Sequence, residues 1–192
     1  VMLEGSSTGL ARLAVHLIAS LPDVRSPEAG PPTYTQRKAN CVTTSFRGLG
    51  LRAELVDALA VAGIEHPFAI QQATIEDALA GADVCGKAKT GSGKTLAFGL
   101  PLLQRIVEAR PGHPTALILV PTRELASQVV EVLVPLGKSV NARVCAFYGG
   151  TSLDRQMRNL TKRIEVAVAT PGRLIDLLER GVIDLDQVST LV

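Results

Sequence analysis

The sequence predicts an α/β fold in which a mostly parallel sheet is flanked by helices. Three short, nearly continuous apolar runs have the composition of buried strands, at 116–120, 144–148 and 166–169. Runs with helical spacing separate them, and each strand is followed by small or polar residues. Strands that are apolar on both faces are typical of parallel sheets covered by helices on both sides. At 192 residues the chain has room for one such domain and an appendage.

The expected elements follow one another from Phe46 onward. Apolar residues at helical spacing predict helices at 52–62, 71–80, 96–108, 124–136, 153–160 and 173–179. Short apolar runs predict strands at the three segments above, and residues 83–87 are also interpreted as a short strand. We therefore assign residues 46–192 to a single domain.

Residues 1–45 lack this alternation. The stretch from 20 to 45 is rich in Pro, Gly, Ser and Thr, and it predicts a flexible, partly disordered N-terminal extension. The only candidate targeting segment, 10–21, contains Arg12 and His16 and has no basic residue before it. It fits a short amphipathic helix better than a signal peptide, which favours a cytoplasmic protein without a membrane partner. The cysteines are too scattered for a disulfide frame or a metal site: Cys41, Cys85 and Cys145.

The charge balance and the scarcity of aromatic residues limit the ligands to be expected. Twenty basic and 18 acidic side chains leave a formal charge of +2, which does not by itself indicate a nucleic-acid-binding protein. Aromatic residues make up 3% of the chain, with no Trp and two Tyr. Modules that bind nucleic acid by stacking on bases rely on such side chains. A bound nucleic acid would therefore be held mainly by its sugar–phosphate backbone.

A glycine-rich segment between a predicted strand and a predicted helix has the pattern of a phosphate-binding loop: Ala88, Lys89, Thr90, Gly91, Ser92, Gly93, Lys94 and Thr95. Its small residues let backbone amides surround a phosphate chain, Lys94 can reach the terminal phosphates, and the Thr95 hydroxyl can bind Mg²⁺. Ala88 stands where the strict pattern has Gly. The alternative is an ordinary surface turn, but the strand–loop–helix context favours a nucleoside triphosphate site.

Four further motifs surround this loop in sequence order. Phe46 precedes the segment 63–71, which ends in Gln71, and a Gln amide can pair with the N6 and N7 edge of adenine. Three other motifs each end a predicted strand and open a helix. They are Pro121-Thr122-Arg123, Gly149-Gly150 and Thr170-Pro171-Gly172-Arg173. Singly, each also has a structural explanation as a turn or a helix cap.

Together these motifs resemble the first RecA-like domain of the DEAD-box ATP-dependent RNA helicases, over residues 46–192. The resemblance implies that Phe46 and Gln71 stack on and read adenine, and that 88–95 bind ATP, with Lys94 and Thr95 as catalytic contacts and Thr95 on Mg²⁺. It implies that the other three motifs bind the backbone of RNA. Amides at helix N-termini, hydroxyls and Arg side chains are phosphate-binding groups without base specificity, which agrees with that assignment.

The resemblance also indicates what to expect beyond the last motif. Residues 190–192 match the start of the strand that carries the Asp-Glu-Ala-Asp tetrad in that family. The tetrad, the Ser-Ala-Thr segment and the second RecA-like domain with its arginine fingers are not matched here. We therefore expect a fragment that binds ATP and RNA without efficient hydrolysis. The alternatives are a non-catalytic ATP- or RNA-binding module, a DNA translocase of the same superfamily, and an unrelated P-loop kinase or GTPase.

Overall fold

A computed structural model describes residues 45–192, so the expectations for 1–44 lie outside the described residues. The helices of the described part are α2 (Ala53–Val61), α3 (Ala69–Leu79), α4 (Lys94–Gln104), α5 (Arg123–Ser139), α6 (Leu153–Leu160) and α7 (Pro171–Glu179). The strands are β1 (Ala116–Leu119), β2 (Val144–Phe147), β3 (Val166–Ala169) and β4 (Thr190–Leu191). Among these residues no helix is long and apolar enough to cross a membrane.

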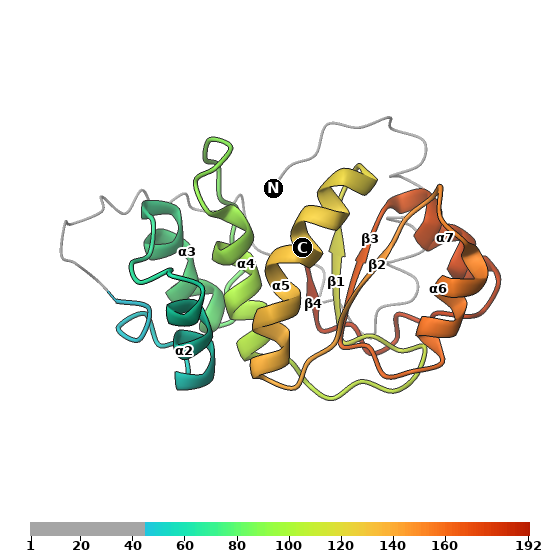
Figure 1. Cartoon of the computed structure of the whole chain (residues 1–192), viewed down its shortest axis with the longest axis horizontal. Coiled ribbons are helices and arrows are strands. Elements are labelled where there is room, and N and C mark those ends of the chain that lie inside the picture. The colour runs from blue at the N-terminus through green and yellow to red at the C-terminus, as the bar shows by residue number, and fades with distance from the viewer. Residues whose placement is uncertain (1–44) are drawn as a thin grey trace, which may run out of the picture.

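The strands form one parallel sheet in the order β2-β3-β1-β4. In β3, Val166 lies beside Ala116 on one side and beside Val144 on the other. The three strand pairings of this sheet are parallel, and a helix lies in the connection between β1 and β2 and between β2 and β3 (Figure 1). The predicted α/β class with a parallel sheet flanked by helices is confirmed.

Strand alternation divides the core between the two faces of the sheet. In β3, Val166 and Val168 belong to a cluster with buried residues of α2, α3, α4 and α5, whereas Ala167 and Ala169 pack with α6 and α7 on the other face. Successive side chains of a strand point to opposite faces, so a four-residue run of small apolar residues supplies both clusters. All four side chains of β3 are buried. The layers are visible in Figure 1, where α5 covers one side of the strands and α7 lies on the other.

Helix α4 ends four residues before the predicted boundary. The Gln104 side chain accepts a hydrogen bond from Arg52 N at 2.8 Å and donates one to Gly50 O at 2.8 Å. Arg52 Nη2 in turn donates to Leu103 O at 3.1 Å, which satisfies a carbonyl at the helix end. These tertiary contacts hold the end of the helix, and no periodicity in the sequence would reveal them.

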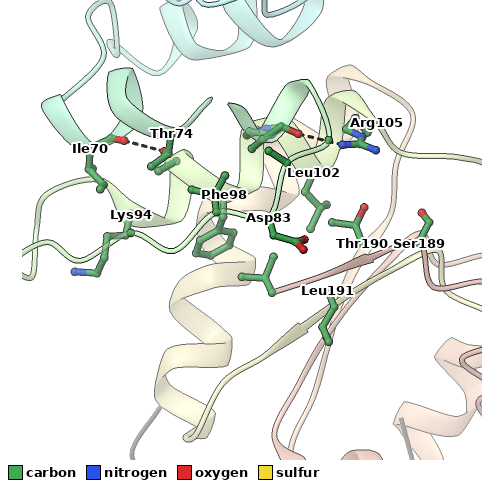
Figure 2. A pocket seen from close by; sticks show the side chains of 18 residues that line it. Ile70, Thr74, Asp83, Lys94, Phe98, Leu102, Arg105, Ser189, Thr190 and Leu191 are labelled. Atoms are coloured by element: carbon green, nitrogen blue, oxygen red, sulfur yellow. Dashed lines mark hydrogen bonds between the residues drawn. The ribbon is translucent and has the colours of Figure 1, made fainter. Parts of the chain in front are cut away.

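The strand predicted at 83–87 is not formed, and that prediction was wrong. Residues 82–89 have no regular secondary structure. A strand requires a hydrogen-bonded neighbour, and the described sheet ends at β4, across a groove of about 350 Å³ lined by Asp83, Val84 and Gly86 on one side and by 189–192 on another. Figure 2 shows this groove, with Asp83 and Phe98 on the side of α4 and with Thr190 and Leu191 on β4.

Candidate functional site

The phosphate-loop segment forms a turn that leads directly into α4. Gly91 and Gly93 have φ values of +80° and +81°, a left-handed conformation that favours glycine. Gly93 is the N-cap of α4, and the first turn of this helix contains no acidic residue. The positive end of the helix dipole is thus available to an anion, whereas the amide of Ser92 donates to Lys89 O at 3.3 Å in this structure. The loop lies at the same end of the molecule as the carboxyl end of β1 (Figure 1).

Lys94 is folded onto the carbonyl groups of its own loop. Its Nζ atom donates to Ala88 O and to Lys89 O, both at 2.8 Å. Ser92 Oγ is buried and makes no hydrogen bond within the described residues. Open space around the Cα of Gly91 and a half-buried Thr95 in the first turn complete a cradle that fits a phosphate chain. Binding a phosphate requires Lys94 to exchange these carbonyls for the more favourable anion.

Gln71 links helix α3 to the phosphate loop. Its side chain is buried, Oε1 accepts from Phe68 N at 2.7 Å, and Nε2 donates to Gly93 O at 3.0 Å. A Cβ built on Gly93 would lie 2.3 Å from Gln71 Nε2, so this close contact requires glycine. Both polar groups of the Gln71 amide are therefore engaged within the protein, and pairing with adenine requires at least one of them to be released.

The two aromatic residues near this segment differ in accessibility. Phe46 is only 2% exposed and packs in the core cluster of α2–α5, so its ring offers no open face to a base in this structure. Phe68, by contrast, is 57% exposed and adjoins the loop, because a Cβ added to Gly93 would lie 2.9 Å from the ring. Stacking of Phe46 on adenine stays a prediction that requires its ring to become exposed, and the exposed ring beside the loop in this structure is that of Phe68.

The three motifs predicted to bind RNA come together at one edge of the sheet. Thr122 follows β1, Gly149 follows β2, and Thr170 follows β3, and these three strands are adjacent and parallel. Their carboxyl ends therefore point the same way. Thr122 Oγ1 caps α5 by accepting from Leu125 N at 3.2 Å, whereas Thr170 makes no capping hydrogen bond. The edge consequently combines helix N-termini with hydroxyl groups.

Arg123 is exposed and lies beside the glycine turn. A Cβ built on Gly150, whose φ is +82°, would lie 3.5 Å from Arg123 Nη1. Arg123 Nε also donates to Glu124 Oε1 at 2.6 Å. This hydrogen bond and the Glu124 charge raise the pKa of Arg123, and the same hydrogen bond lowers the pKa of Glu124. A nucleic-acid phosphate at this position would compete with Glu124 for the guanidinium.

Arg173 is more enclosed than Arg123. Its side chain is 12% exposed, and its Nε lies 3.7 Å from Asp176 Oδ2. Arg173 Nη1 is buried and has no hydrogen-bond partner within the described residues. Asp176 is shared, because it also accepts from Arg180 Nε at 2.6 Å. Of the two predicted RNA-binding arginines, Arg123 is therefore the more accessible.

Sequence reasoning missed Gln156, which belongs to the same edge. Its Nε2 atom donates to Tyr148 O at 2.9 Å and to Thr151 Oγ1, on either side of the two glycines. The signal was its position, since Gln156 lies in the first turn of α6 and helical side chains point towards the helix N-terminus. Such a side chain reaches back over the preceding loop.

Among residues 45–192 one group of side chains has the composition of a cation site. His113, Asp184 and Asp186 offer ligand atoms within 4.8 Å of one another, and His113 Nδ1 lies 2.7 Å from Asp186 Oδ1. Arg110 Nη2 lies 3.7 Å from Asp186 Oδ2 and supplies a competing positive charge. The group precedes β1 and β4, at the edge opposite to the motifs above. It is thus separate from Thr95, the predicted Mg²⁺ ligand.

Comparison with known proteins agrees with this geometry. The family model for the DEAD/DEAH box helicase matches residues 68–192. The chain is 46% identical over 149 residues to DEAD-box ATP-dependent RNA helicase 9, mitochondrial, from Arabidopsis thaliana, covering 75% of this chain and 24% of that protein. It is 47% identical over 150 residues to the ATP-dependent RNA helicase DeaD from Escherichia coli strain K12, covering 78% and 24%. It is 44% identical over 149 residues to the ATP-dependent RNA helicase CshA from Listeria monocytogenes, covering 78% and 28%.

The chain spans about a quarter of the length of these relatives. It belongs to the DEAD/DEAH box helicase family.

Proposed function

We propose that this chain is the ATP- and RNA-binding motor domain of an ATP-dependent RNA helicase that acts in the cytoplasm. ATP is bound by residues 88–95 and RNA by the loops that follow β1, β2 and β3. The observation that carries the proposal is the placement of the phosphate loop and the three RNA motifs at one end of a parallel sheet. The names of the three relatives, all ATP-dependent RNA helicases, support the choice of ATP and RNA.

In the proposed nucleotide complex, Lys94 leaves the carbonyl groups of Ala88 and Lys89 and binds the terminal phosphates. The amides of Gly91, Ser92 and Gly93 and the N-terminus of α4 bind the remaining phosphate oxygens. Thr95 would hold Mg²⁺, which neutralises charge on the phosphates when it is bound. Gln71 accounts for a preference for adenine once its amide turns from the loop towards the base.

The proposed RNA contacts involve only the backbone. Arg123, Thr170 and the amides of Gly149 and Gly150 are suited to phosphate oxygens and offer no base-specific pattern. Arg173 and the N-terminus of α7, where Pro171 occupies the first turn and Gly172 follows, complete the set. Binding of this kind is independent of sequence and weakens as the salt concentration rises.

Nucleotide binding is tested by titrating the chain with a fluorescent ADP analogue and Mg²⁺ while circular dichroism monitors folding. Saturable binding is expected, and Lys94→Ala should weaken it by at least tenfold because it removes a charge-assisted contact. Gln71→Ala should weaken binding less. Lys138→Ala, at the far end of α5, serves as the matched control and should leave binding unchanged. A well-folded chain that binds no nucleotide would contradict the proposal.

Two alternatives to this proposal can be tested by measuring ATP hydrolysis and the preference for RNA over DNA. RNA-stimulated phosphate release that disappears with Lys94→Ala would show that this chain hydrolyses ATP by itself, whereas binding without turnover supports a non-catalytic binding module. A DNA translocase would bind DNA and RNA of matched sequence equally well. A helicase specific for RNA should prefer RNA, because the 2′-hydroxyl distinguishes the two.

A further inference from the structure

The loop between β2 and α6 is held by one buried side chain. Gln156 is 6% exposed, and its Nε2 atom donates to Tyr148 O at 2.9 Å and to Thr151 Oγ1. Thr151 Oγ1 itself donates to Tyr148 O at 3.2 Å. The three groups close a ring of hydrogen bonds around the two residues in between, Gly149 and Gly150. The amide orientation is fixed, because only the nitrogen end can donate to the Tyr148 carbonyl.

The other end of the Gln156 amide is unsatisfied. Oε1 is buried and makes no hydrogen bond with any described residue. A buried acceptor without a partner destabilises a fold, and an apolar side chain of the same shape would avoid that cost. A glutamine at this position is therefore not explained by packing alone. The remaining reason for a glutamine is the pair of hydrogen bonds that Nε2 donates to Tyr148 O and Thr151 Oγ1.

The ring of hydrogen bonds fixes a turn that faces Arg123. Gly150 has a φ of +82°, and a Cβ on this residue would lie 3.5 Å from Arg123 Nη1. Tyr148 is also bound to α5, because Ser127 Oγ donates to its hydroxyl at 3.4 Å. The turn after β2 and the first turns of α5 are thus held in one arrangement. A phosphate group could contact the amides of the turn and Arg123 at the same time.

We propose that Gln156 is a positioning residue for RNA binding, which sets the geometry of the Gly149-Gly150 turn against Arg123. This inference rests on the proposed RNA-binding function. Gln156 acts through the turn and does not itself contact RNA. Its loss should weaken RNA binding and leave nucleotide binding unchanged, since the phosphate loop belongs to a different segment of the chain.

Two nearly isosteric substitutions in the full chain test the proposal. Gln156→Glu keeps the shape and removes both N–H donors, and Gln156→Met removes donors and the unsatisfied acceptor together. We expect Gln156→Met, which adds no charge, to raise the Kd for a fluorescein-labelled, single-stranded RNA about fivefold, the value of one or two hydrogen bonds. Gln156→Glu should raise the Kd further, because its carboxylate also repels the phosphates. We expect Gln156→Met to keep or raise the midpoint of urea unfolding. Gln187→Met, in the loop before β4 at the opposite edge, is the matched control and should leave RNA affinity unchanged.

A merely structural role predicts a different pattern. RNA affinity would then follow stability, so the Met variant would bind RNA as well as the parent chain, and that result would overturn the proposal. Equal losses of RNA and ADP-analogue affinity would also overturn it. Arg123→Met separates this inference from the function on which it rests. If Arg123→Met weakens RNA binding and both Gln156 variants do not, only the positioning role is wrong. If none of the three affects RNA binding, the RNA-binding function of this edge is wrong as well.

Discussion

Two parts of the sheet differ in how fully their strands are paired and buried. One is formed by β1, β2 and β3, and the other lies beside the phosphate loop. Each residue of β3 has a partner on both sides, and all four of its side chains are buried. Beside the phosphate loop, β4 contains two residues, Leu191 is 50% exposed, and 83–87 face a groove with no described strand beside them. An apolar segment therefore becomes a strand only where the fold supplies a hydrogen-bonding neighbour.

The largest predicted effect is a difference in the free energy of unfolding lost when each of two valines is replaced by Asp. Val168 is fully buried in β3, and Val168→Asp places a carboxylate among apolar side chains with no partner. The loss should exceed about 4 kcal/mol, enough to prevent cooperative folding. Val84, beside the groove, is 39% exposed, and Val84→Asp should cost less than about 1 kcal/mol. Urea unfolding followed by circular dichroism measures both, and similar losses at the two sites would mean that the two regions are equally well packed.

The same difference explains how far the sequence could predict the fold. Strand β3 and helix α6 were predicted with their observed bounds, because local periodicity and burial agree there. The segment 83–87 was predicted wrongly, because Val84 and Cys85 resemble the centre of a short strand, but the sequence cannot show whether a neighbouring strand is present. The early end of α4 was missed for a related reason, since it depends on contacts with Arg52 from another part of the chain.

Within the candidate site, the order of the motifs along the chain predicted where their loops lie, but it did not predict the environment of their side chains. The topology brought the loops after β1, β2 and β3 to one edge, as parallel strands require. The burial of Phe46 in the core cluster of α2–α5 and the hydrogen bond from Gln71 to the loop depend on tertiary packing, which a motif cannot reveal. Gln156 was missed because a single glutamine in a helix carries no signal until the turn before it is recognised.

A second, smaller difference in stability is expected when each of two glycines is replaced by Ala. A Cβ on Gly137, at the end of α5, would lie 2.7 Å from the backbone oxygen of Ala142, which is held by the connection to β2. Gly137→Ala should therefore destabilise the chain by about 1–3 kcal/mol. Gly86, beside the groove, would bring its Cβ to 3.2 Å from Ile70 Cδ1, the end of a side chain that can move. Gly86→Ala should cost less than about 0.5 kcal/mol in the same urea titration.

If Gly86→Ala were the more damaging substitution, the region beside the groove would be packed more rigidly than its missing strand pairing indicates. Gly149→Ala provides a control for introducing a methyl group, because a Cβ there has no atom within 4 Å. It should leave the unfolding midpoint close to that of the parent chain. A large loss at Gly149 would mean that the cost lies in the backbone and not in a clash.

The smallest predicted effect concerns the rates at which a thiol-specific reagent modifies two cysteines. Burial raises the pKa of the Cys145 thiol in β2, with the Glu165 charge adding to the effect and Arg143 opposing it. Cys85, beside the groove, is exposed. In a Cys41→Ser background, a thiol-specific reagent at neutral pH should modify Cys85 at least several-fold faster, because the thiolate is the reactive form and access is required.

The pH dependence of these rates distinguishes the two causes. A raised pKa means that the folded chain holds the Cys145 proton more tightly than the unfolded chain does. The contribution of this thiol to stability is therefore complete below its ordinary pKa and is lost as the pH rises through the folded value. The Cys145 rate should continue to rise at pH values above the ordinary pKa of a thiol, because its thiolate forms only at higher pH. A Cys145 rate that levels off at the ordinary thiol pKa would assign its slow reaction to restricted access alone. Equal rates at neutral pH would show that β2 opens as readily as the segment beside the groove, which would remove the basis for treating the two regions as different.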